Sequence, residues 1–167
     1  MKKAQISQVF TYLVIILVIG VIAIMGYKGI AWILKTQCTH QRVLFEKNLL
    51  DFIDEYSDYG SVNEETLSAP CDVTTVCFVD STYYEPIAPR LDIMQLGNDS
   101  VIKSAADDKI TNIFFKAKFT EPIGLSKKVA LKSEDAPFKC FEAKSGKFKF
   151  VFRGLGKKTQ IESGWMV

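Results

Sequence analysis

The sequence predicts an α+β protein in which a long N-terminal helix packs on an antiparallel β-sheet. An uncharged, mostly apolar run extends over residues 4–27, and apolar residues at helical spacing continue beyond it as far as Tyr56. After Gly60 the period changes, because apolar residues then alternate with charged ones in short segments separated by turn residues. The change of period divides the chain into a helical first part and a β-rich remainder.

The apolar run over residues 9–25 has the length and composition of a transmembrane helix. Its Leu, Ile, Phe and Val residues each favour insertion into a bilayer. A buried helix of a soluble protein is the alternative interpretation, but such a helix normally keeps a polar face and this run has none. We therefore expect a single-pass membrane helix that contacts membrane lipid.

Helical periodicity continues past this run as one apolar stripe, while charged residues occupy the other faces. Gly60 follows Tyr59 and fits the left-handed residue that ends a helix. These features predict one helix over residues 7–59 whose stripe packs against the sheet. The stripe consists of Cys38, Phe45, Leu49, Phe52, Ile53 and Tyr56.

Six short segments after Gly60 are predicted strands. In the clearest of them, Phe148, Phe150 and Phe152 face the core, while Lys147, Lys149 and Arg153 face water. Residues 144–146 predict a hairpin turn that joins this strand to the preceding one. Residues 84–108, which include two prolines, a glycine and an Asp-Asp pair, predict an irregular insertion. The predicted strands are residues 75–81, 110–120, 127–132, 138–143, 147–153 and 158–162.

A short stretch of basic, small and polar residues precedes the apolar run. In an ordinary secretory signal the cleavage site follows the apolar segment, so cleavage removes that segment from the product. Here the order is reversed, and cleavage would leave the apolar helix attached. The alternative is that Lys2 and Lys3 are the basic flank of any N-terminal membrane anchor.

Lys3-Ala4 is followed by Gln5-Ile6-Ser7, and the aromatic Phe10 comes three residues later. This order resembles the class III signal peptides of archaeal type IV pilin-like proteins. The resemblance implies cleavage between Ala4 and Gln5 by a prepilin-type peptidase. A long N-terminal helix, apolar in its first half and amphipathic in its second, is also the organisation of type IV pilins, so the resemblance implies a type IV pilin-like fold.

The implied organisation is a cleaved leader at residues 1–4, a transmembrane or filament-core helix at 5–27, an amphipathic continuation at 28–60 and an extracellular β-rich head at 61–167. Val9, Phe10 and Leu13 would lie in the part of the helix that contacts lipid or other subunits. Val9 takes the fifth position of the processed chain, which in these proteins is often Glu and helps to register subunits in a filament.

Two functions follow from this resemblance and stay open. The chain is either a structural subunit or minor component of a pilus-like filament, with itself or other pilin-like subunits as partners, or a monomeric anchored binding domain that does not polymerise. Val9 in place of the acidic residue favours the second function.

The sequence contains four cysteines, with no Cys-x-x-Cys motif, and a single histidine, His40. This pattern is typical of disulfides outside the cell rather than of a metal site. We therefore place the head outside the cell and the N-terminus in the cytoplasm. Of the three pairings, spacing favours Cys71 with Cys77 and Cys38 with Cys140. Reduced cysteines buried as small apolar side chains are the alternative.

Signatures of nucleophilic, nucleotide and zinc chemistry are missing from the sequence, so we expect no catalytic residues, no cofactor, no metal and no enzyme activity. An anchored ectoenzyme would require a pocket with perturbed titratable groups. The 21 basic and 19 acidic residues are nearly balanced, which argues against a nucleic-acid partner. Asn98 begins the triplet Asn98-Asp99-Ser100, which fits the N-glycosylation acceptor pattern.

Overall fold

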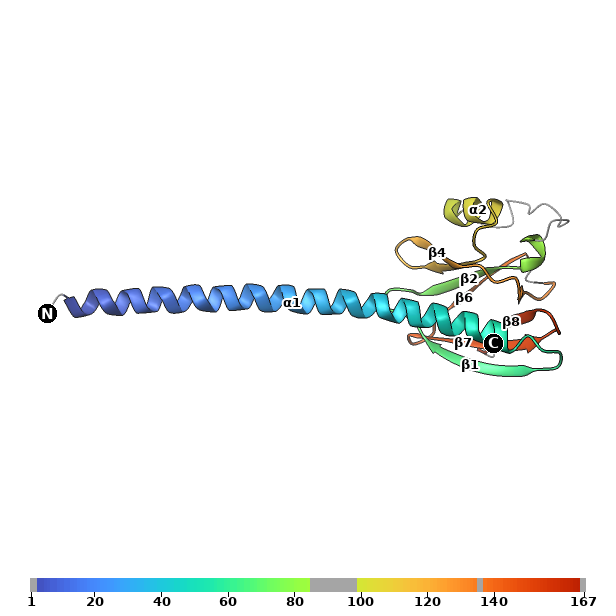
Figure 1. Ribbon diagram of the computed structural model, residues 1–167, viewed down its shortest axis with the longest axis horizontal. Coiled ribbons are helices and arrows are strands. Elements are labelled where there is room, and N and C mark those ends of the chain that lie inside the picture. The colour runs from blue at the N-terminus through green and yellow to red at the C-terminus, as the bar shows by residue number, and fades with distance from the viewer. Residues whose placement is uncertain (1–2, 85–98, 135–136, 166–167) are drawn as a thin grey trace. The chain divides into compact units, whose positions relative to one another are not determined.

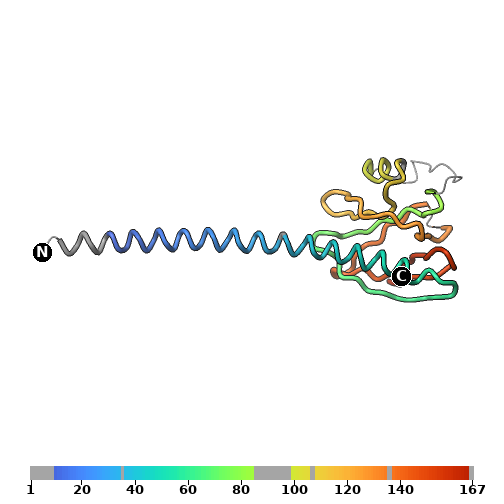
Figure 2. The backbone as a smooth tube through the Cα atoms, in the orientation of Figure 1, coloured from blue at the N-terminus to red at the C-terminus, as the bar shows by residue number. Residues whose placement is uncertain are grey.

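The computed structural model describes residues 3–84, 99–134 and 137–165 of the 167-residue chain. The chain divides into two compact units, residues 1–40 and residues 41–167. The described part of the first unit is helical throughout, whereas the second unit, which we call the head unit, contains two β-sheets (Figures 1 and 2). The expected α+β class is thereby confirmed.

Helix α1 (Lys3–Glu55) contains no proline, in keeping with its length. Its C-terminal end lies in the head unit, where side chains bond carbonyl groups that a helix end leaves without intrahelical partners. Thr159 Oγ1 donates to the carbonyl oxygen of Ile53 at 2.5 Å, and Lys128 Nζ donates to that of Asp54 at 3.3 Å. Gly60 has a φ of 83°, so the predicted left-handed residue is confirmed, although the helix ends earlier than expected.

The first sheet, sheet A, has the strand order β1-β7-β8-β5. Strands β1 (Val62–Ser68), β7 (Lys147–Gly154) and β8 (Thr159–Ser163) are antiparallel, and the two-residue β5 (Val129–Ala130) runs parallel to β8. Lys144 bridges to Lys147 across a turn in which both Ser145 and Gly146 have positive φ. Two successive positive φ values match the right-handed twist of a tight hairpin, so the predicted turn is confirmed.

The second sheet, sheet B, has the order β4-β3-β2-β6 and is antiparallel throughout. Its strands are β2 (Thr75–Val79), β3 (Ile113–Lys116), β4 (Thr120–Gly124) and β6 (Phe138–Glu142). A short 3-10 helix, η1 (Ser81–Tyr84), follows β2. Helix α2 (Ser100–Asp107) supplies Ile102 to a second buried cluster with Val79 and Phe114 of sheet B.

The main core lies between the two sheets, with the last part of α1 packed into it (Figure 1). The ring of Phe45 lies 5.3 Å from that of Phe115 in sheet B and 5.4 Å from that of Phe148 in sheet A. Farther along, Phe78 and Phe150 contact each other directly from the two sheets. The last part of α1 and both sheets therefore all contribute side chains to one aromatic core. Its fully or almost fully buried members include Phe45, Leu49, Ile53, Phe78, Ile113, Phe148, Phe150, Phe152 and Ile161.

Several predicted elements differ from the observed ones. Residues 100–107 form α2 rather than irregular chain, and the strand predicted over 110–120 shortens to β3, because the chain turns at residues 117–119 and enters β4 at Thr120. The strand predicted over 127–132 shortens to β5, while β1 has no counterpart among the predictions. The β1 sequence, Val-Asn-Glu-Glu-Thr-Leu-Ser, lacks apolar alternation, so its strand form depends on pairing with the phenylalanine-rich β7.

The predicted disulfide pairing is wrong, because Cys77 is bonded to Cys140. The two residues are direct register partners on the neighbouring strands β2 and β6, with Cα atoms 4.0 Å apart. Cys71 is close to Cys77 in sequence, but it lies in the turn that precedes β2. Sheet register, which sequence spacing does not reveal, decides the pairing. None of the four cysteines is free.

Candidate functional site

The first candidate site is the apolar surface of α1 over residues 10–34, which we call the apolar segment. None of its large apolar side chains is buried; Ile16 is 71% exposed and Met25 is 69% exposed. Burial of one such side chain contributes about 1.5–3 kcal/mol, so the segment as a whole requires an apolar environment. The exposed residues are Phe10, Tyr12, Leu13, Val14, Ile15, Ile16, Leu17, Val18, Ile19, Val21, Ile22, Ile24, Met25, Tyr27, Ile30, Trp32, Ile33 and Leu34.

The dimensions of this segment match a bilayer. By length and composition, α1 is the one helix in the described part of the chain that is suited to crossing a membrane. Tyr12 and Trp32 are both exposed and are separated by about 30 Å along the helix at 1.5 Å per residue. That distance is the thickness of a hydrocarbon core, at whose two boundaries aromatic residues are enriched. The segment and the disulfides together indicate a membrane-anchored protein that faces an oxidising exterior.

The sequence-predicted processing residues lie at the beginning of α1. Lys3, Ala4, Gln5 and Ser7 have helical backbone, as does Val9, and their side chains lie outside the described set. Phe10 and Leu13 are described and exposed. The glycosylation candidate Asn98 lies outside the described residues.

In the head unit, an ion-pair cluster fixes α1 to two other elements. Arg42 donates to Asp72 at 2.8 Å and to Glu121 of β4 at 2.5 Å, so one guanidinium joins the helix, the turn before β2 and sheet B. The hydrogen bond from Arg42 lowers the pKa of the Asp72 carboxyl below its ordinary value. Because the two carboxylates are exposed and the half-buried guanidinium is paired with both of them, the cluster is structural rather than a reactive centre.

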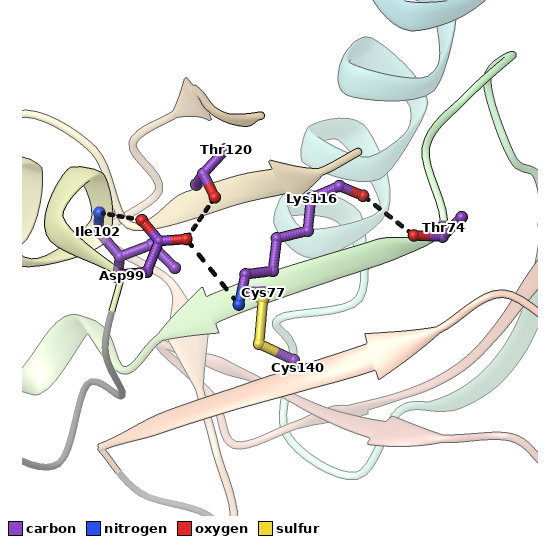
Figure 3. The surroundings of a disulfide bond; sticks show 7 residues. All are labelled: Thr74, Cys77, Asp99, Ile102, Lys116, Thr120 and Cys140. Atoms are coloured by element: carbon purple, nitrogen blue, oxygen red, sulfur yellow. Dashed lines mark hydrogen bonds and ion pairs between the residues drawn. A yellow bond between two sulfur atoms is a disulfide. The ribbon is translucent and has the colours of Figure 1, made fainter. Parts of the chain in front are cut away.

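A second polar cluster surrounds the start of α2, beside the disulfide (Figure 3). Asp99 accepts hydrogen bonds from the backbone amide of Ile102 and from the hydroxyl of Thr120, and Lys116 Nζ lies 3.9 Å from its carboxylate. Burial raises the pKa of Asp99, but the hydrogen bonds from Thr120 and from the α2 amides outweigh burial and leave the pKa below its ordinary value. This arrangement is a helix N-cap, in which the carboxylate of Asp99 accepts hydrogen bonds from α2 and from sheet B. The Asp before the α2 sequence is the signal from which the helix was predictable.

Two hollows are present on the described surface of the head unit. One, of about 350 Å³, lies between α1 and β1, and the other, of about 400 Å³, lies between α2 and β4. In the described residues no group of three or more His, Cys, Asp or Glu side chains converges as a metal site would require. The first hollow is lined by Gln41, Leu44, Phe45, Asn48, Thr66, Leu67, Ser68 and Ala69. The second is lined by Ser100, Val101, Ser104, Ala105, Asp108, Ile110, Thr111 and Pro122.

The hollow between α1 and β1 was not predictable from the sequence, because β1 itself carries no strand signal. The hollow between α2 and β4 falls partly in a segment that was expected to be irregular. Comparison of the chain with protein-family models, with curated proteins and with solved structures finds no match.

Proposed function

We propose that this chain is a membrane-anchored surface protein, processed by a prepilin-type peptidase between Ala4 and Gln5, and that it is a structural subunit or minor component of an archaeal type IV pilus-like filament. The observation that carries the proposal is the apolar segment, exposed on all sides of α1. The same helix supplies Phe45, Leu49 and Ile53 to the head core. One helix thus combines an assembly or membrane surface with a structural part of the head.

An all-round apolar helix suits both environments that a pilin subunit meets. Lipid surrounds it before assembly, and the helices of neighbouring subunits would surround it in a filament core. Gly20, Gly26 and Gly29 leave open space on the helix surface, since no atom of the chain lies within 4 Å of where their Cβ atoms would be. Close helix approach is sterically allowed at these positions. In this proposal the N-terminus is cytoplasmic before export, the head is extracellular, and no catalytic activity is assigned.

The alternative function is a monomeric membrane-anchored binding domain. Val9 favours it, because an apolar residue at the fifth position of the processed chain cannot supply the charge that helps to register pilin subunits. The apolar segment would then contact lipid alone. The two functions share the anchor and differ in whether α1 meets another α1.

The first test measures the N-terminal residue of the native protein extracted from membranes, by mass spectrometry. We expect a start at Gln5 in the native protein and in the conservative control Ile6→Leu. Ala4→Phe places a bulky side chain at the cleavage site and should leave the chain starting at Met1. A native start at Met1 would refute processing, and a start after the apolar segment would refute the anchor.

The second test separates the filament from the monomer. Leu13→Cys places a thiol on the exposed apolar segment, and Tyr59→Cys places one on the head, where Tyr59 is 88% exposed. After mild oxidation of intact cells, a filament subunit should give disulfide-linked dimers through position 13. Monomeric chains from both variants, with no filaments in electron micrographs, would refute the structural role and leave the anchored binding domain.

A further inference from the structure

Strand β1 is the longest edge strand of the two sheets, and its outer edge is open. Gly154 N donates to Ser61 O at 2.8 Å, and Ala69 N donates to Gly146 O at 2.8 Å, so hydrogen-bonded pairs stand at both ends of the β1–β7 ladder. Hydrogen-bonded and open pairs alternate in an antiparallel ladder. The odd-numbered residues therefore bond β7, and the even-numbered ones direct their amides and carbonyls away from it. In the described part of the chain these outward groups have no other backbone partner; they belong to Val62, Glu64, Thr66 and Ser68.

The hollow between α1 and β1 adjoins this open edge. Its buried side chains, Phe45 and Leu67, form an apolar base, and Leu44 of α1 lies beside them with 57% of its surface exposed. Thr66 and Ser68, whose backbone groups point outward, also line it. We call the open edge of β1 together with this hollow the edge groove. An extended segment paired with β1 would direct alternate side chains toward the hollow.

Carboxylates outnumber basic groups on the two elements that border the edge groove. Glu64 and Glu65 lie on β1, and Asp51 and Glu55 are exposed on α1 one and two turns beyond Asn48, whereas Lys47 is the one exposed lysine on this stretch of the helix. Glu64 pairs with Lys149 at 2.7 Å and Glu65 accepts a hydrogen bond from Tyr56, which leaves the two helix carboxylates for a partner. The complementary segment is therefore basic.

The edge of β1 is less protected than the edges at β4 and β5, because the charged residues that it carries, Glu64 and Glu65, are engaged with Lys149 and Tyr56. Natural edge strands are usually shielded by charged side chains, especially lysine, by proline, by a bulge or by short length. Edge strand β4 contains Pro122 and pairs through a register shift, and β5 has two residues. Strand β1 has seven residues and contains neither proline nor lysine.

We propose that the edge groove docks an extended basic segment of a partner protein, which adds to sheet A beside β1 and places an apolar side chain in the hollow next to Leu44. Backbone hydrogen bonds supply affinity in this mode of recognition, and the hollow and the acidic rim supply selectivity. The proposal does not rest on the proposed function, because the groove belongs to the head unit in a filament subunit and in an anchored monomer alike.

The test measures binding of a fluorescein-labelled octapeptide that alternates valine and lysine to the full chain in zwitterionic detergent micelles, by fluorescence anisotropy. Empty micelles and a peptide that alternates valine and glutamate are the controls. We expect the basic peptide to bind at least about tenfold more tightly than the acidic one. Amide exchange followed by NMR should slow at Glu64, Thr66 and Ser68 when the basic peptide is present.

Two variants and one matched control locate the binding. Leu44→Ala removes the side chain beside the hollow and should weaken binding about tenfold, whereas Val43→Ala, an equally exposed neighbour that does not line the hollow, should leave it unchanged. Thr66→Pro removes an outward amide without a β7 bond and should also weaken binding about tenfold. The comparison of peptide binding between Leu44→Ala and Val43→Ala tests the proposal even if the proline variant does not fold.

Three results would overturn the proposal. Binding that is equal in the native chain, Leu44→Ala and Val43→Ala would place the peptide elsewhere, and absence of binding at about 1 mM peptide would remove the docking site. Concentration-dependent protection of the β1 amides without peptide would show that a second copy of this chain, rather than a basic partner, fills the groove.

Discussion

Gly154 at the end of β7 is the position where one added methyl group should do most damage to the head unit. An added Cβ atom would lie 2.7 Å from the carbonyl carbon of Asp58 and closer still to its oxygen. These are backbone atoms of the turn that follows α1, so no side-chain rotation relieves the clash. Gly154 N also donates to Ser61 O, and Gly60 N donates to Gly154 O at 3.2 Å.

The magnitude follows from these contacts. Gly154→Ala must displace the turn and weaken two backbone hydrogen bonds, each of which contributes about 1 kcal/mol. Overpacking of a rigid site adds about 1–3 kcal/mol. We expect the free energy of unfolding to fall by about 3–5 kcal/mol and the melting temperature by about 15 °C or more.

The assay is thermal unfolding of the full chain in detergent micelles, followed by near-ultraviolet circular dichroism of the aromatic core. Gly124→Ala is the matched control, because its added Cβ would lie 3.5 Å from the nearest atom, a flexible Leu50 methyl group. We expect the control to melt within a few degrees of the native chain. If Gly154→Ala also melted close to the native chain, the turn after α1 would not be held by its approach to β7.

Three further outcomes are expected from the head unit. Replacing both Cys77 and Cys140 by alanine opens a link across 63 residues and should lower the free energy of unfolding by about 4 kcal/mol, measured by urea titration; a loss below about 1 kcal/mol would contradict the chain-entropy reasoning. Because the pKa of Asp99 is lowered in the folded protein, its carboxylate stabilises the head above about pH 4, and this stabilisation is lost as the pH falls. The free energy of unfolding should therefore fall less on acidification in Asp99→Asn than in the native chain. The same pH profile in both proteins would contradict this role of Asp99. The hydrogen bond to Glu65 raises the pKa of Tyr56 to about 12, so stability from this pair should decline as the pH rises above about 10. Ultraviolet titration should then show a lower Tyr56 pKa in Glu65→Gln, and an unchanged value would exclude the hydrogen bond as the cause.

Local periodicity was sufficient to predict the main helix and several strands. Phe45, Leu49 and Ile53 recur on one helix face and are buried, as expected, while Phe52 and Tyr56 at the edge of that stripe are half-buried. The alternation in β7 was equally informative, because the side-chain period of a strand assigns each residue to a face. Such patterns predict which face of an element is buried, but they do not predict which other element packs against that face.

The sequence by itself determined that an apolar helix begins the chain, that its continuation is amphipathic and that a β-rich head follows, because these properties depend on residues close together along the chain. Tertiary structure alone decided the bond between Cys77 and Cys140, the division of the strands into two sheets and the open edge of β1. Those features arise from register between segments tens of residues apart, and weakly patterned residues such as those of β1 adopt their structure because a strongly patterned partner pairs with them.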